Sequence, residues 1–197
     1  MDKTAIEHWS PVIGGQFWWT GLIFVLIFVP LMIFLGSKIS SKQRDMVLYG
    51  MGIYQLGNKA LTQIGYIFSD NYIMASNLPL HLCGLSGILA GIVVFYRKQI
   101  LFEFLYFFGL VGFIHSVLTP EFTGGVSSWK IFDYYVGHSM LIIIPVWFMK
   151  YYEFRLRHNA WWTSFIYLQL IVVLVSQANS IIGNGANYMY LAKAPIA

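Results

Sequence analysis

Charged side chains are scarce in this chain. Asp, Glu, Lys and Arg together make up 10% of its 197 residues, whereas apolar residues make up 58%. A water-soluble domain carries about 25% charged residues. The composition therefore excludes an ordinary soluble fold and indicates a protein whose surface faces lipid.

Cysteine is almost absent as well. One cysteine excludes an intramolecular disulfide and a cysteine-rich metal site. The sequence has no nucleotide-binding motif and no pair of histidines at helical i,i+4 spacing, so we expect no cofactor and no metal ion. The formal net charge of +4 arises in loops, where membrane topology explains it, and no nucleic-acid partner is expected.

Long apolar runs are abundant. A membrane-spanning helix needs about 20 mostly apolar residues. Six segments qualify, and they cover residues 17–35, 46–68, 79–96, 100–118, 131–148 and 161–182. The loops between them are short. The predicted fold is therefore all-α, a polytopic transmembrane helical bundle with six spans, formed by residues 1–197 as a single domain.

The basic residues predict the orientation of this bundle. Eight Lys and Arg residues lie in the first, third and fifth connections, whereas the alternate side carries Lys3, Lys130 and Lys193. Cytoplasmic loops are enriched in Lys and Arg. We therefore expect a multi-pass protein of the cytoplasmic (inner) membrane with its amino terminus outside.

Ionisable and polar residues interrupt the predicted spans on one side of the bilayer. At about 1.5 Å per residue, Cys83, His115, His138 and Lys59 lie roughly 5 to 13 Å from the outer ends of their helices. The set comprises Lys59, His81, Cys83, His115 and His138, and Asn179 lies in the last outer turns of the sixth span. Because such groups are costly in hydrocarbon, they indicate a functional site. We expect one shared polar cavity in the outer half of the membrane.

The second predicted helix carries a polar stripe. Gln55, Lys59 and Gln63 recur every four residues and so lie on one face. Lipid cannot satisfy their hydrogen bonds, so the stripe faces protein or water. For the glutamines, contacts that hold helices together are the favoured explanation. Lys59 needs a partner, and Asp133 on the opposite wall is a candidate.

Cys83 lies early in the third predicted helix, where Pro79 suits the first turn and Asn77 suits the cap. A cysteine nucleophile needs a base, and His138 and His115 lie at a similar depth. The alternative is that Cys83 is a small buried apolar residue, as most membrane cysteines are.

Four motifs occur in order along the chain. They are Leu-Pro-Leu-His-Leu-Cys at residues 78–83, Leu-Thr-Pro at 118–120, Gly-His at 137–138, and Asn-Tyr-Met-Tyr-Leu at 187–191 with Lys193 and Pro195. The sequence thereby resembles the YwaF-type family of bacterial integral membrane proteins, relatives of the animal transmembrane protein 164. The resemblance implies a lipid acyltransferase in which Cys83 is the nucleophile and His138 the base, with Asn187 in a supporting motif. It also implies a seventh helix, which this chain lacks.

We therefore expect an integral membrane enzyme of lipid acyl transfer or lipid-ester hydrolysis. It would act on a phospholipid or acyl-lipid through a thioester on Cys83. Lys59, His81, His115, Asn179 and Asn187 would bind substrate or support the site. The alternative is a small-solute transporter or channel with a polar cavity of Lys and His side chains.

Overall fold

The computed structural model describes residues 8–68, 72–123 and 126–194, and nearly all of its regular structure is helical. The helices are α1 (Gln16–Lys38), α2 (Ser41–Ile67), α3 (Met74–Asn77), α4 (Leu82–Tyr96), α5 (Gln99–Leu118), α6 (Ser128–Tyr151), α7 (Ala160–Ile182) and the single 3-10 turn η1 (Tyr188–Tyr190). Two short strands, β1 (His8–Trp9) and β2 (Phe122–Thr123), pair antiparallel. The all-α prediction is confirmed. Lys3 and Pro195 lie outside the described residues.

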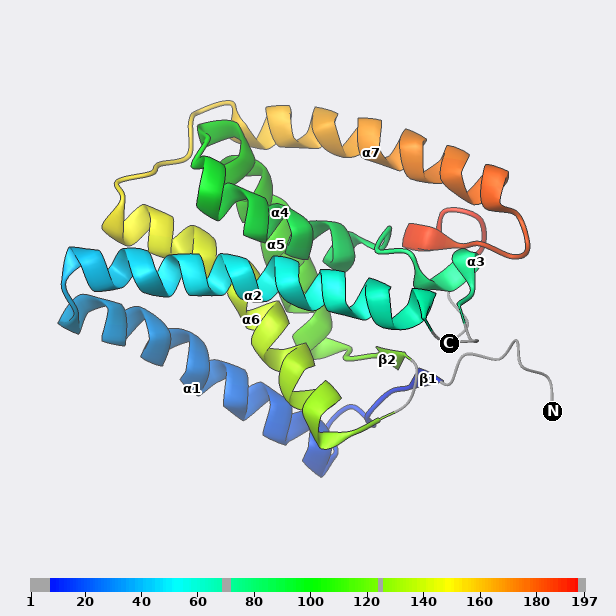
Figure 1. Ribbon diagram of the computed structural model, residues 1–197, viewed down its shortest axis with the longest axis horizontal. Coiled ribbons are helices and arrows are strands. Elements are labelled where there is room, and N and C mark those ends of the chain that lie inside the picture. The colour runs from blue at the N-terminus through cyan, green and yellow to red at the C-terminus, as the bar shows by residue number, and fades with distance from the viewer. Residues whose placement is uncertain (1–7, 69–71, 124–125, 195–197) are drawn as a thin grey trace.

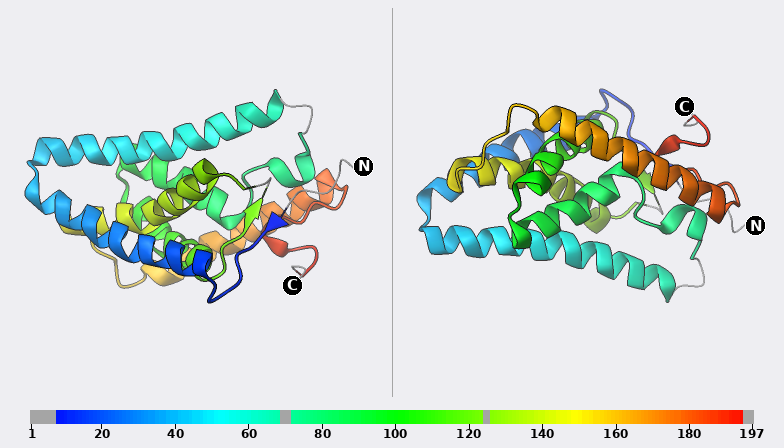
Figure 2. Two further views of the ribbon diagram at one scale, coloured as in Figure 1. Left: turned by 90° about the horizontal axis from the view of Figure 1, so that it is seen from below. Right: turned by 90° about the horizontal axis from the view of Figure 1, so that it is seen from above.

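The middle of the bundle consists of α4, α5 and α6, with α1, α2 and α7 around them (Figures 1 and 2). The central helix α6 packs against α1, α2, α4 and α5, whereas α7 packs mainly on α5. The largest cluster of buried apolar side chains includes Val93 and Val94 of α4 with Ile143, Ile144 and Trp147 of α6. The core therefore sits where the three central helices meet.

The six predicted segments correspond to α1, α2, α4, α5, α6 and α7. Among the described helices, α1, α5, α6 and α7 are long and apolar enough to cross a membrane. Helix α4 is apolar but has 15 residues, so it is about 22 Å long, shorter than the roughly 30 Å hydrocarbon core. Helix α2 has 27 residues, but polar side chains such as Lys59 interrupt its apolar ones. The chain is a multi-pass membrane protein.

The start of α4 differs from the prediction. The helix begins at Leu82 rather than at Pro79, because the backbone is still extended at His81, which has φ −71° and ψ 152°. Asn77 does not cap α4. It ends α3, and its Oδ1 accepts a hydrogen bond from Ile73 N at 2.6 Å. The predicted helix start and cap were therefore wrong.

Helices α5 and α6 approach closely at Gly109. A Cβ atom built on this glycine would lie 2.6 Å from the backbone oxygen of Leu141, closer than real Cβ atoms come. Small residues at a helix interface allow two backbones to approach in this way. Gly109 therefore helps to set the separation of the two helices that enclose Cys83.

Candidate functional site

The Cys83 thiol lies at the junction of three helices. Cys83 is half-buried in the first turn of α4. A Cβ atom built on Gly112 of α5 would lie 3.6 Å from Cys83 Sγ and 3.6 Å from Leu141 Cδ1 of α6. Gly112 of α5 thus lies between the sulfur and a side chain of α6.

His138 lies one helical turn from this junction. It precedes Leu141 by three residues, so both side chains share one face of α6. His138 Nδ1 lies 2.7 Å from the carbonyl oxygen of Tyr134. A carbonyl oxygen can only accept, so Nδ1 carries the hydrogen and the neutral ring keeps its lone pair on Nε2. Among the described residues no hydrogen bond joins His138 to Cys83.

The Tyr134 ring also packs against the His138 imidazole. The ring centroids of Tyr134 and His138 are 4.2 Å apart. The Tyr134 hydroxyl donates to the carbonyl oxygen of Ser116 on α5 at 3.2 Å. The residue that fixes the tautomer of His138 therefore also connects α6 to α5.

Lys59 and Asp133 bring opposite charges to the same region. The Lys59 side chain lies against α4, where a Cβ atom on Gly87 would be 3.0 Å from its Cε. Lys59 lies within electrostatic range of the Asp133 carboxylate and of Cys83, whose thiolate form its charge would stabilise. Asp133 Oδ1 accepts hydrogen bonds from the Tyr54 hydroxyl and from Asn58 Nδ2, the latter at 2.6 Å. The carboxylate thus has two donors from α2 and is the nearby counter-charge for Lys59.

The other polar residues of α2 connect it to its neighbours. Gln55 Nε2 donates to the carbonyl oxygen of Gly137 on α6 at 2.8 Å. Gln63 Nε2 donates to the carbonyl oxygen of Asn77 at 2.7 Å. These contacts are the interhelical hydrogen bonds that polar side chains commonly form in membrane bundles.

The described hydrogen bonds of His115 and His81 go to residues other than Lys59, Cys83 and His138. His115 is exposed near the end of α5, and its Nδ1 lies 3.0 Å from Thr119 Oγ1. His81 is exposed, and its Nδ1 accepts from Met189 N at 3.4 Å. Within the part of the chain that the structure describes, no three His, Cys, Asp or Glu side chains lie close enough together to hold a metal ion.

Asn179 and Asn187 organise the segment after α7. Asn179 Nδ2 donates to Tyr188 O at 3.0 Å, and its Oδ1 accepts from Tyr188 N at 2.9 Å. Asn187 Oδ1 accepts from the backbone of Ala192 and Lys193, each at 3.0 Å. The buried Tyr188 hydroxyl in turn donates to Met74 O at 2.6 Å. Burial raises the pKa of Tyr188, which keeps this hydroxyl protonated.

A sequence profile of the TMEM164 family matches residues 7–197. The chain belongs to the TMEM164 family. The predicted relation to the animal protein is therefore confirmed. No curated protein and no solved structure matches the chain significantly. Membership in the TMEM164 family agrees with the multi-pass helical fold, but membership alone does not assign a reaction.

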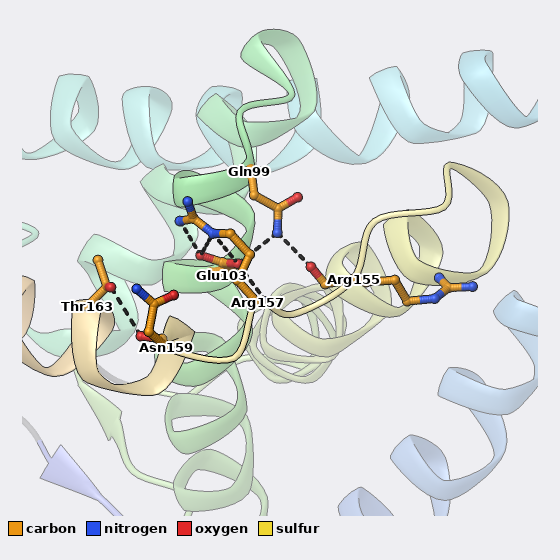
Figure 3. Close-up of polar contacts among 6 residues, drawn as sticks. All are labelled: Gln99, Glu103, Arg155, Arg157, Asn159 and Thr163. Carbon is orange, nitrogen blue, oxygen red and sulfur yellow. Dashed lines mark hydrogen bonds and ion pairs between the residues drawn. The ribbon is translucent and has the colours of Figure 1, made fainter.

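Sequence analysis of this TMEM164-family chain missed Glu103. Its side chain is 1% exposed near the start of α5, and Arg157 Nη2 lies 2.7 Å from its Oε2 (Figure 3). Gln99 Nε2 and the backbone N–H of Arg157 also donate to Glu103 Oε1, at 2.8 and 2.9 Å. An acidic residue within a predicted span was the available signal. Its partner lies 54 residues further along the chain.

Proposed function

We propose that this protein is an integral membrane enzyme of lipid acyl transfer or lipid-ester hydrolysis. Cys83 forms the thioester and His138 is the general base. The observation that carries this proposal is the tautomer of His138. Its Nδ1–H is committed to the Tyr134 carbonyl, so Nε2 is an acceptor on the face of α6 that also carries Leu141, which shares Gly112 with Cys83 Sγ as a neighbour.

In the first step His138 Nε2 takes the proton from Cys83 Sγ. The thiolate attacks the acyl carbonyl carbon of a phospholipid, so that an S–C bond forms and the ester C–O bond breaks. The departing alkoxide takes the proton from the imidazolium. The products are a lysophospholipid and an acyl thioester on Cys83.

In the second step the acceptor is a lipid hydroxyl or water. It loses its proton to His138 Nε2 and attacks the thioester carbonyl, so that a C–O bond forms and the C–S bond breaks. The Cys83 thiolate then takes the proton back from the imidazolium. Transfer to a lipid hydroxyl gives a new ester, whereas transfer to water gives a fatty acid.

The oxyanion of each step needs hydrogen-bond donors. The first N–H that bonds within α4 belongs to Leu85, which donates to His81 O at 3.0 Å. The backbone N–H groups of Leu82, Cys83 and Gly84 precede it in the helix and have no intrahelical acceptor. These groups, together with the Lys59 ammonium, supply the positive field for the oxyanion.

The proposed setting is a bacterial cytoplasmic membrane with the amino terminus outside. This orientation is supported by the meeting of the basic loops at one end of the bundle. Arg97 pairs with Asp45 at 2.9 Å, and Gln99 Nε2 donates to Arg155 O at 2.6 Å. Lys and Arg are enriched in cytoplasmic loops, so the opposite end, where α4 begins, faces outward.

A transporter of small solutes is less well supported. Transport needs a polar path to both sides of the membrane. Between the thiol and the basic end, α4 and α6 bury apolar side chains that are 0–1% exposed, among them Val93, Val94, Ile143 and Trp147. This packing favours a site that opens to one side.

The test is the intact mass of protein purified in native lipid. The wild type is expected to carry an acyl adduct that hydroxylamine removes, and to release lysophospholipid. The adduct is expected to be absent from Cys83→Ala and His138→Gln. His158→Gln is the matched control, because His158 is exposed in the loop that carries Arg155 and Arg157, at the opposite end of the bundle, and it should retain the adduct. Lipid turnover that persists in Cys83→Ala would end the proposal. Solute uptake by the wild type without any adduct would favour the transporter.

A further inference from the structure

A groove opens beside the helix turn that carries Cys83. It has a volume of about 230 Å³ and lies between α5 and α7, with the start of α4 at its edge. Val111 and Phe108 of α5 and Trp161 and Phe165 of α7 are among its lining residues, and Leu82 represents α4. The groove therefore lies within segments that are apolar and long enough to cross a membrane.

Two of the residues that line the groove are neighbours of the candidate thiol. Leu82 precedes Cys83 in the chain. Phe108 lies one helical turn before Gly112, the residue against which Cys83 Sγ rests. An acyl group bonded to the sulfur would therefore start one residue along α4, and one turn along α5, from side chains of the groove.

The lining of the groove suits an acyl chain. It is apolar apart from Ser164, which is 4% exposed. A hydrocarbon chain is apolar along its whole length and offers this lining no unsatisfied polar group. Leu82 also places the groove beside the residue that would carry the acyl group.

We propose that this groove binds the acyl tail of the phospholipid whose ester carbonyl reacts at Cys83. The inference rests on the proposed function. It adds that the acyl tail is the part of the phospholipid by which the enzyme selects its substrate. The aromatic walls formed by Phe108, Trp161 and Phe165 contact the tail, and Val111 limits the space available along α5. The depth of this groove therefore determines which lengths of acyl chain the enzyme accepts.

The first experiment compares two tryptophan substitutions at matched valines. Val111→Trp fills the groove, whereas Val173→Trp places the same side chain on α7 outside it. Val111 and Val173 are 56% and 54% exposed. The protein is reconstituted in phosphatidylethanolamine vesicles with lauroyl and palmitoyl chains, and the adduct masses on Cys83 are measured. The ratio of palmitoyl to lauroyl adduct is expected to fall about tenfold in Val111→Trp and to stay unchanged in Val173→Trp. An unchanged ratio in Val111→Trp, or an equal fall in both variants, would overturn the groove assignment.

A second experiment does not depend on thioester formation. Photoreactive p-benzoylphenylalanine replaces Val111 or Val173 in a Cys83→Ser protein, which is washed in lipid-free detergent before irradiation. A cross-linked mass of one phospholipid at position 111, retained more strongly than at position 173, is expected. A protein dimer cross-linked at position 111, or equal lipid retention at both positions, would contradict the proposal. Failure of the proposed function is distinct, because it would remove the adduct from the wild type without changing this result.

Discussion

The Tyr188 hydroxyl accepts the backbone N–H of Leu78 at 2.9 Å, across 110 residues of sequence. This bond satisfies a donor in the extended segment that precedes α4. A buried backbone N–H needs an acceptor, and Tyr188, which is 0% exposed, supplies it. Two of the sequence motifs, residues 78–83 and 187–191, therefore meet at the helix start that carries the candidate nucleophile.

Replacement of Tyr188 by phenylalanine should loosen this helix start. The variant loses the bonds to Leu78 N and Met74 O, at a cost of about 1–3 kcal/mol. Since 1.4 kcal/mol corresponds to a tenfold change in an equilibrium constant, labelling of Cys83 by maleimide should accelerate about tenfold. The maleimide label reports on Cys83 alone, because the chain has one cysteine. Tyr190→Phe, which removes an exposed bond to Glu121, should leave the rate near that of the wild type. Equal rates in all three proteins would show that Tyr188 does not position α4.

Lys59→Met should separate a role in the site from a role in packing. Methionine keeps much of the length of the side chain beside Gly87 and removes the charge that interacts with Cys83. If Lys59 stabilises the thiolate or the oxyanion, the rate of adduct formation should fall about 10²-fold or more. The melting temperature should stay equal or rise, because a charge inside a membrane bundle is costly. Lys42→Met, at an exposed position, is the control. A normal rate in Lys59→Met would leave this residue with a structural role alone.

Much of this fold could be predicted from the sequence, because a membrane limits the solutions to helices with long apolar runs. The segments at 100–118 and 161–182 match α5 and α7 within two residues. The start of α4 was missed because its backbone is satisfied by Tyr188, from a distant part of the chain. The grouping of Cys83 with His138 depends on helix neighbours, which depth along a span does not specify. Depth alone also placed His115 in the group, whereas the structure exposes it.

The pairing of Glu103 with Arg157 predicts an asymmetry between single and double variants. Arg157→Met leaves the buried Glu103 carboxylate without its main donor, and should lower the melting temperature of the protein. The double variant Glu103→Gln with Arg157→Met should recover most of this loss, since no unpaired charge remains. Thermal unfolding in detergent micelles gives the comparison. Arg155→Met is the control, because Arg155 donates only to the backbone oxygens of Met149 and Phe154. Additive losses in the double variant would argue against direct coupling.

Two glycines one turn apart on α5, Gly109 and Gly112, should respond differently to replacement by alanine. At Gly109 a Cβ atom would lie 2.6 Å from the backbone oxygen of Leu141, so α5 and α6 must separate. At Gly112 the nearest atoms, Cys83 Sγ and Leu141 Cδ1, would both lie at 3.6 Å, an ordinary contact. Gly109→Ala should therefore cost about 1–3 kcal/mol of stability, whereas Gly112→Ala should fold like the wild type.

The same pair tests whether the spacing of α5 and α6 controls the chemistry. Cys83 rests on α5 and His138 projects from α6, so a wider gap should separate the thiol from its base. Gly109→Ala is expected to slow adduct formation even at temperatures where the protein is fully folded, as judged by its circular dichroism. Gly112→Ala should keep a rate close to that of the wild type, because the added methyl group meets the sulfur at contact distance. A folded Gly109→Ala protein with an unaltered rate would mean that Cys83 and His138 do not act across this interface.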